Sequence, residues 1–180
     1  MAKHYPALVL NADARPLSYH PLSTWPWEDA IKAVIADRVT VLAEYDETAR
    51  SPTFEIRLPS VILLREYVDL NRPAAFSRWN LAVRDRFACA YCNSPDELTF
   101  DHVLPKSRGG ASLFSNALLA CSGCNSRKGN RTPAEAGMVP RHMPWTPTVA
   151  ELREIGRLYP PPEIPISWQD YAYWRVPLES

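Results

Sequence analysis

Apolar and polar residues in the first part of the chain follow patterns typical of strands and of one helix. Residues 7–10, Ala-Leu-Val-Leu, are a short apolar run that predicts a buried strand. Residues 27–35 place their apolar side chains on one helical face, with Thr24 as the expected N-cap and Pro26 in the first turn. Three later runs of β-branched, aliphatic and aromatic residues predict strands at 39–45, 54–58 and 61–68. Residues 1–72 are therefore expected to form a small αβ unit.

A second group of short elements follows this unit. Residues 98–100 predict a short strand, which we expect to pair with the segment 88–91. The run 116–121 then leads into a short helix that ends at Gly129. Two short strands, a loop and a helix are therefore expected to form a separate module over residues 73–138.

The last part of the chain is rich in proline and aromatic residues. A capping box at 132–135, Thr-Pro-Ala-Glu, predicts that a helix begins there. A further helix is expected within 146–159, ended by the three prolines 160–162. Eight of the 18 prolines and three of the six tryptophans lie in residues 140–180. We expect residues 139–180 to form a C-terminal helix and an extended segment that wraps over the core, the alternative being a contact with nucleic acid or another subunit.

Length and composition limit the class of protein. At 180 residues and 46% hydrophobic content, the chain can bury one sizeable core, or a small core together with a metal-held module. The patterns above favour the second arrangement. Apolar stretches such as residues 61–64 are far shorter than the ~20 residues that span a bilayer, and no N-terminal run resembles a signal peptide. We therefore expect a cytoplasmic protein without a membrane partner.

All four cysteines fall in two Cys-x-x-Cys pairs, Cys89 with Cys92 and Cys121 with Cys124. Four thiolates satisfy tetrahedral Zn²⁺ with no open position, so the pattern predicts a structural zinc site. Disulfide bonds are the alternative, but a reducing compartment favours thiolate ligation, and no cysteine is left over. The gap between the pairs is 28 residues, longer than the about 15–20 of an ordinary zinc ribbon. The gap therefore holds an inserted segment with a further role.

The inserted segment carries residues suited to phosphodiester hydrolysis. Asp101 offers a hard oxygen ligand for a divalent metal, and His102 offers an imidazole base. Neighbouring side chains point to opposite faces of a regular strand, so the two can act together only if the strand ends or bulges near Pro105. The net charge is zero, which argues against a nucleic-acid partner, but residues 72–131 hold 9 Lys and Arg against 4 Asp and Glu. A local basic face is enough to meet phosphates, so this distribution restores that partner.

The order of these residues resembles that of a known family. Cys-x-x-Cys, Asp-His-x-x-Pro-x-x-x-Gly-Gly, Asn and Cys-x-x-Cys-Asn-x-x-Lys-Gly follow one another over residues 84–131. This order resembles the HNH endonuclease family, whose motif folds as a ββα-metal finger, and the N-terminal segment is similar to the leader of one bacterial branch. The three signature positions would be His102, Asn116 and Asn125, the third being Asn rather than His. The implied fold class is α+β: a small N-terminal αβ unit, a zinc-stapled ββα-metal module and a C-terminal segment rich in proline and aromatic residues.

The resemblance implies a metal-dependent endonuclease that hydrolyses DNA. His102 would be the general base, and Asn116 would hydrogen-bond the loop and thereby orient His102. Asp101 and Asn125 would hold a catalytic Mg²⁺ or Mn²⁺, separate from the structural Zn²⁺. The DNA is expected to be double-stranded, and its phosphates would be contacted by Lys106, Arg108, Arg127, Lys128 and Arg131.

Two other functions stay open at this point. One is a zinc-finger-like nucleic-acid-binding module without catalysis, and the other is a zinc-held protein-interaction domain. The intact set of Asp101, His102 and Asn125 favours the enzyme, because a binding module needs no base beside a hard-metal site. The basic segment disfavours the protein-interaction domain. The sequence leaves the target, the oligomeric state and the biological role open.

Overall fold

The computed structural model describes residues 4–51, 54–159 and 163–172. The chain divides into two units, residues 1–70 together with 156–180, and residues 71–155. The C-terminal segment is thus shared between the units instead of standing apart. Across the described residues, every helix is too short or too polar to cross a membrane.

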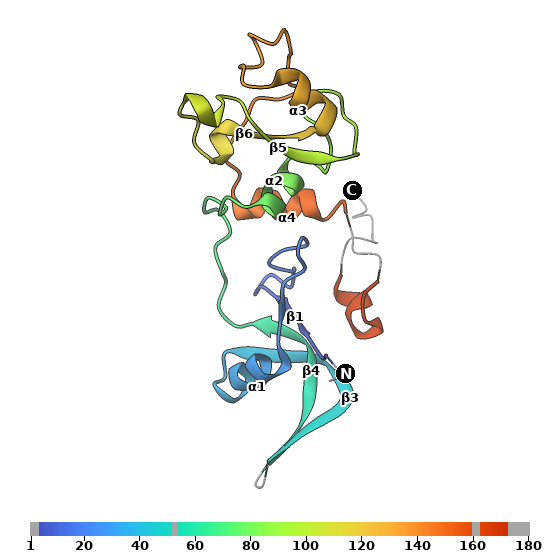
Figure 1. Cartoon of the computed structure of the whole chain (residues 1–180). Helices are drawn as coiled ribbons and strands as arrows, with labels where there is room; N and C mark the ends of the chain where they lie inside the picture. The colour runs from blue at the N-terminus through green and yellow to red at the C-terminus, as the bar shows by residue number, and fades with distance from the viewer. Residues whose placement is uncertain (1–3, 52–53, 160–162, 173–180) are drawn as a thin grey trace, which may run out of the picture. The chain divides into compact units, whose positions relative to one another are not determined.

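Strand β1 (Ala7–Leu10) forms as predicted, and all four of its apolar side chains are fully buried. It lies in a four-stranded sheet with the order β2-β1-β4-β3. Figure 1 labels β1, β4 and β3 of this sheet. The other strands are β2 (Thr24–Trp25), β3 (Val39–Ser51) and β4 (Phe54–Leu64). β4 runs parallel to β1, whereas β2 and β3 are antiparallel to their neighbours. A strand covered on both faces has a continuous apolar sequence, as β1 does.

Alternate residues of β1 belong to two separate cores. The odd-numbered residues pack against helix α1 (Trp27–Ile35). The even-numbered residues pack with Trp168 of the 3-10 helix η3 (Ile166–Tyr171) on the other face. This η3 helix is the described part of the segment expected to wrap over the core, whose residues 173–177 lie outside the described ranges.

The second unit is organised around a two-stranded antiparallel sheet. Strand β5 (Leu98–His102) pairs with β6 (Ala117–Cys121) over five residues, from Leu98 opposite Cys121 to His102 opposite Ala117. β6 leads directly into helix α3 (Ser122–Lys128), which ends at Gly129 as predicted. The connection between the strands contains two 3-10 turns, η1 (Lys106–Arg108) and η2 (Phe114–Asn116).

Helices α2 (Arg78–Arg84) and α4 (Val149–Gly156) complete the second unit. Its apolar core joins these helices to β6 through Ala74, Leu81, Val83, Phe114, Ala117 and Leu152. The resulting mixture of short helices and small sheets confirms the α+β class.

A buried arginine ties the second unit together. The Arg84 side chain is inaccessible to solvent and forms an ion pair with Asp85, with 2.7 Å between Nε and Oδ1. Its guanidinium also donates to the backbone carbonyls of Phe114, Trp145 and Ala117. A buried charge is tolerated only when it is paired and hydrogen-bonded, and removing one partner of such a pair costs about 3–5 kcal/mol. Arg84 therefore fixes the segment around Trp145 to the cysteine-bearing unit.

The structure corrects the expected strands of the first unit. The runs 54–58 and 61–68 were predicted as two strands, but β4 is continuous from the first run to Leu64. Pro59 stands inside this strand and pairs with Glu44, next to register shifts in β3. Such bulges tolerate a residue without a backbone N–H, which explains why proline does not end the strand.

The predicted partner of β5 was wrong. The segment 88–91 is not a strand, and β5 pairs with β6 instead. The segment still reaches β6, because Ala90 N donates to the Leu119 carbonyl at 2.7 Å. The loop therefore lies beside β6 and carries the first two cysteines to the end of the sheet.

Helix boundaries differ from expectation at three places. Thr24 is not the N-cap of α1, because it lies in β2 and α1 begins after Pro26 without a side-chain cap. Thr132 and Glu135 do form the two hydrogen bonds of a capping box, but turns follow them, not an α-helix. Helix α2 was not predicted, although Ser77 is its N-cap and accepts a backbone N–H three residues later.

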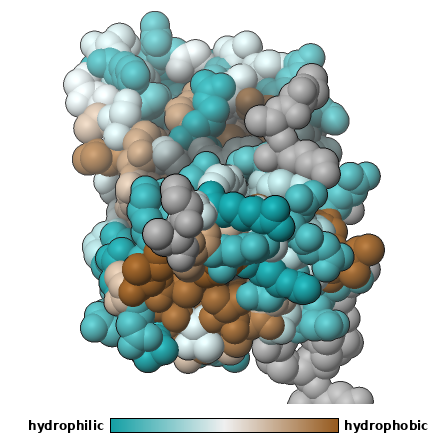
Figure 2. Space-filling model, turned by 90° about the horizontal axis from the view of Figure 1, so that it is seen from below, coloured by the Kyte–Doolittle hydropathy of each residue, from teal (hydrophilic) through white to brown (hydrophobic). Residues whose placement is uncertain are grey.

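Some large apolar side chains stay at the surface. Seen from below, hydrophobic side chains gather in a patch that hydrophilic ones surround, as Figure 2 shows. In the first unit the exposed large apolar residues include Ile35, Leu42, Phe54 and Tyr67. Individual exposed apolar residues are normal on protein surfaces, so they are not evidence for a partner.

Candidate active site

The four cysteines gather at one end of the β5–β6 pair. Cys121 ends β6 and caps α3, Cys124 lies in the first turn of α3, and Cys89 and Cys92 come from the loop after α2. All four Sγ atoms lie within 4.8 Å of one another, and those of Cys92 and Cys121 are 3.7 Å apart. A Zn–S bond of about 2.3 Å places tetrahedral sulfurs about 3.8 Å apart. The cysteines are therefore positioned to form a zinc site.

The thiols of Cys89 and Cys124 differ in how readily they ionise. Burial raises the pKa of Cys89, but backbone N–H groups around it, including that of Tyr91, outweigh burial and lower the pKa to about 7. Burial and the neighbouring sulfurs raise the pKa of Cys124 to about 12. A dication favours ionisation of both, because the thiolate is the metal-binding form. The chemistry of the donor set therefore fits Zn²⁺.

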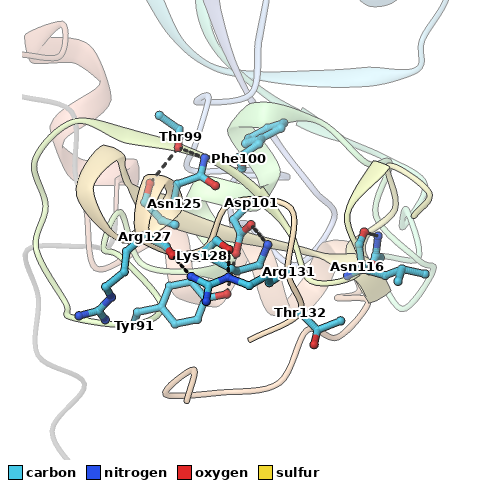
Figure 3. A network of polar contacts seen from close by, with 12 residues as sticks. Tyr91, Thr99, Phe100, Asp101, Asn116, Asn125, Arg127, Lys128, Arg131 and Thr132 are labelled. Atoms are coloured by element: carbon cyan, nitrogen blue, oxygen red, sulfur yellow. Dashed lines mark hydrogen bonds and ion pairs between the residues drawn. The ribbon is translucent and has the colours of Figure 1, made fainter. Parts of the chain in front are cut away.

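Asp101 lies at the centre of a buried polar network, drawn in Figure 3. Its side chain is 2% exposed, and each carboxylate oxygen has its own partner. Oδ1 is 2.7 Å from the Lys128 ammonium, and Oδ2 accepts a 2.6 Å hydrogen bond from the Tyr91 hydroxyl. Burial and the Asp101 carboxylate raise the pKa of Tyr91, so the phenol stays protonated and donates a hydrogen bond to Asp101. Both oxygens of Asp101 are thus held in place by groups from outside β5.

Asn125 is oriented by its amide nitrogen. Nδ2 donates to the Thr99 hydroxyl at 2.9 Å and to the Phe100 carbonyl at 3.3 Å (Figure 3). A backbone carbonyl only accepts hydrogen bonds, so this contact determines which end of the amide faces β5. Among the described residues no donor reaches Asn125 Oδ1. This oxygen is therefore available as a ligand.

His102 ends β5 at the opposite end from the cysteines. Its Nε2 lies 3.0 Å from the Ser112 hydroxyl. Burial lowers the pKa of His102 below its ordinary value of 6.5, and the charge of Lys106 lowers it further, against the opposing effect of Asp101. The imidazole is therefore neutral near pH 7, which is the form that accepts a proton.

Asp101 and His102 turn to different partners. Thr99 and Asp101, two positions apart on β5, both contact α3, whereas His102 contacts the loop through Ser112. This follows the alternation of side chains along a strand. β5 ends at His102, but both residues still pair with β6, opposite Leu118 and Ala117, so their side chains point to opposite faces of the ladder.

Asn116 closes the loop that follows His102. Its Oδ1 accepts a hydrogen bond from Leu104 N at 2.8 Å, and its Nδ2 donates to the carbonyls of Leu104 and Ala111 at 3.1 and 2.9 Å. Gly110 permits this closure, because a Cβ at that position would lie 1.7 Å from the Leu104 carbonyl oxygen. The arrangement suits the orienting role predicted for Asn116.

The five basic residues expected to contact DNA differ in availability. Lys106 and Arg127 are exposed. Arg108 is exposed as well, but its guanidinium is 2.6 Å from the carboxylate of the capping box. Arg131 donates to the carbonyls of the last two residues of α3. Lys128 departs from the expectation, because it is 1% exposed and its ammonium is paired inside the unit, where no phosphate reaches it.

The carboxylate of Asp101 and the amide oxygen of Asn125 are of the chemical kind that hard divalent cations take as ligands. Within the described ranges, the cysteine cluster is the one group of three or more His, Cys, Asp or Glu side chains placed to hold a metal. A second metal would therefore rely on the Asp101 carboxylate and the Asn125 amide oxygen, with water and phosphate completing its shell, as is usual for Mg²⁺. A carboxylate has about four lone-pair sites, so the present partners of Asp101 do not exhaust it.

Three residues around the site were not predicted from the sequence: Tyr91, Thr99 and Ser112. Each is a hydrogen-bond partner of a predicted site residue. Strand alternation is a signal that identifies Thr99, because it stands two positions before Asp101 and shares its face. Tyr91 and Ser112 lie in loops, where no periodic pattern indicates direction.

Two family models match the chain. The model described as HNH endonuclease-associated, N-terminal domain matches residues 7–72, which include β1 to β4. The model described as HNH endonuclease matches residues 89–140, which include the four cysteines, β5, β6 and α3. A comparison with curated proteins found no significant match. The second matched segment contains the zinc-type cluster, Asp101, His102 and Asn125 together.

Proposed function

The chain belongs to the HNH endonuclease family, and from this premise we propose that it hydrolyses phosphodiester bonds in DNA. The observation that carries the proposal is the position of the His102 imidazole, which lies against Ser112 at the end of the strand that also carries Asp101. A base and a hard oxygen ligand on adjacent residues are what metal-assisted hydrolysis of a phosphodiester requires.

His102 is assigned to take the proton from the attacking water. This assignment takes the tautomer in which Nε2–H donates to the Ser112 hydroxyl, which leaves the lone pair of Nδ1 to accept the proton. Asn116 keeps the loop beside His102 closed through its three side-chain hydrogen bonds. A fixed loop limits the movement of the ring, and a base is effective only when it is held within hydrogen-bond reach of the water.

Two metal ions would serve different purposes. Asp101 and Asn125 would hold Mg²⁺ or Mn²⁺, which supplies positive charge to the phosphate oxygens. Tyr91 and Thr99 keep these two ligands in position. The four cysteines would hold a structural Zn²⁺ with no open position. All four are free thiols, which suits the reducing environment of the cytoplasm.

The substrate is proposed to be double-stranded DNA that is bound through its backbone. Lys106 and Arg127 are exposed and offer their charges to phosphates, while Arg108 and Arg131 are partly engaged within the unit. Among the described residues, the cysteine-bearing unit has no long helix that would enter a groove and read bases. Binding is therefore expected to depend on charge more than on sequence.

A nucleic-acid-binding module without catalysis is the second candidate. The observation that favours it is the burial of the Asp101 carboxylate, whose two oxygens already contact Lys128 and Tyr91. If Asp101 never exchanged these partners for a metal, the unit would bind DNA and leave it intact. The two functions differ in whether the wild-type protein cleaves the DNA that it binds, and replacement of His102 tests whether that cleavage is its own.

A plasmid cleavage assay with His102→Ala tests the proposal. Wild-type protein with Mg²⁺ or Mn²⁺ should convert supercoiled plasmid to nicked or linear product, and chelation of the metal should stop it. His102→Ala should cleave at least ~100-fold more slowly, the low end of general-base contributions, while its DNA affinity and melting temperature stay close to wild type. His4→Ala, which changes an exposed histidine outside the matched module, is the control. Wild-type protein that binds DNA but leaves it uncut with Mg²⁺ or Mn²⁺ would leave the binding module as the function, and cleavage by His102→Ala at the wild-type rate would refute the assignment of His102 as the base.

A further inference from the structure

The ammonium of Lys128 lies beside the buried Asp101 carboxylate, which needs a positive charge as its partner. The Lys128 side chain is 2% exposed, and its ammonium is 2.7 Å from Asp101 Oδ1. Figure 3 draws this ion pair as a dashed line. Lys128 is the last residue of α3, three positions after Asn125, so the helix brings both residues to the same part of β5. The ammonium and the proposed divalent cation would therefore use the same carboxylate.

The ion pair of Lys128 with Asp101 requires two charges to be buried. Both side chains are almost completely buried, and a buried charge is tolerated only with a close partner. The second oxygen of Asp101 is taken by Tyr91, so the network is satisfied without any metal. A divalent cation that reached Asp101 would meet the positive charge of Lys128 at short range. Two cations beside one carboxylate repel each other, and the cation that is held more weakly, the Lys128 ammonium, has to move away.

We propose that Lys128 is an exchangeable internal counter-ion for Asp101. Its ammonium neutralises the carboxylate while no divalent cation is bound, and it leaves Oδ1 when the cation binds between Asp101 and Asn125. The freed ammonium is then available to a substrate phosphate, which is the role the sequence predicted for this lysine. This inference rests on the proposed function, because it takes the Asp101 and Asn125 oxygens as ligands of Mg²⁺ or Mn²⁺.

Direct measurement of Mn²⁺ binding tests the exchange without relying on cleavage. Free Mn²⁺ is followed by electron paramagnetic resonance while zinc-loaded protein is titrated without DNA. Lys128→Met keeps the length and apolar stem of the side chain but removes the competing charge. It should bind Mn²⁺ at least about tenfold more tightly than wild type, since one nearby charge typically changes the equilibrium of an ionisable group by this factor or more.

Thermal melting gives a second readout. Without added Mn²⁺, zinc-loaded Lys128→Met leaves Asp101 buried without its ion pair, so its melting temperature should fall below that of wild type. Added Mn²⁺ should raise the melting temperature of the variant by more than that of wild type. Lys128→Gln provides a milder neutral variant with the same expected direction, in case the methionine variant does not fold.

The control is Lys106→Met, which removes an exposed charge that also acts on His102. If Lys106→Met tightens Mn²⁺ binding as much as Lys128→Met does, the effect is one of general charge and the exchange is overturned. Unchanged Mn²⁺ affinity in both Lys128 variants also overturns it, even if wild-type protein cleaves DNA, and the proposed function then stands alone. Absence of both Mn²⁺ binding and cleavage in wild type removes the proposed function and this inference together.

Discussion

Replacing Gly110 with alanine tests whether the closed loop beside His102 is needed for catalysis. The added Cβ would lie 1.7 Å from the Leu104 carbonyl oxygen and 2.9 Å from Asn116 Nδ2. The closest obstructing atoms belong to the backbone, so a side-chain rotation cannot relieve the clash. Ordinary contact begins near 3.4 Å, so the Leu104 carbonyl has to retreat by about 1.7 Å. The loop therefore has to open.

The opening should weaken the hydrogen bonds that Asn116 makes across the loop. There are three of them, to Leu104 N, Leu104 O and Ala111 O. Each such bond contributes about 1 kcal/mol net, so the closed loop loses roughly 2–3 kcal/mol. A misplacement of about 1 Å near the reacting groups can cost 100-fold in rate, so we expect cleavage to fall about 100-fold. The melting temperature should fall by no more than this loss of free energy allows, and the module should stay folded at the assay temperature, because the loop opens locally.

The assay is the initial rate of plasmid nicking at saturating Mg²⁺, measured together with zinc content and melting temperature. Gly123→Ala is the matched control, because a Cβ at Gly123 meets nothing within 4 Å although it lies between two of the cysteines. This control should keep the wild-type rate. A Gly110→Ala protein that cleaves as fast as wild type, with its zinc in place, would refute the link between loop closure and the position of His102.

Two further predictions concern the zinc site and the DNA contacts. Cys121→Ser should lose its zinc and the cooperative melting of the module, because metal binding supplies folding free energy there; one retained zinc per chain with unchanged calorimetric melting would contradict this. Arg127→Ala should lower the slope of log K against log salt by about one, measured by titration of labelled duplex DNA. Arg108→Ala should lower it less, because Glu135 already lies 2.6 Å from that guanidinium, and equal effects of the two changes would rule out the ranking.

Features that depend on local spacing were predictable from the sequence. The two Cys-x-x-Cys pairs indicated one four-cysteine cluster, and the structure places all four sulfurs within 4.8 Å. The apolar run of β1 and the stop of α3 at Gly129 were also predicted, because both depend on adjacent residues. The order of motifs indicated the HNH family, and the two family models confirm it.

Features that depend on distant pairing were not predictable in the same way. The sequence places segment 88–91 closer to β5 than β6 is, and nothing local excludes it as the partner strand. The pairing of Asp101 with Lys128 crosses 26 intervening residues, and a lysine in a basic segment is normally exposed. Only the packing of α3 against β5 shows that this lysine points inward, and hence that it competes for the carboxylate instead of lying on the surface.

The two ends of the β5–β6 pair explain how a module with a small core holds a defined site. The cysteine cluster closes the end where Leu98 lies opposite Cys121, and Asn116 closes the loop at the end where His102 lies opposite Ala117. Asp101 and His102 stand on a five-residue ladder between these closures, so its register fixes their positions. The closures differ in strength, because one is a set of metal bonds and the other a few hydrogen bonds at the surface. Loss of the first should therefore unfold the module, whereas loss of the second should leave it folded with a misplaced base.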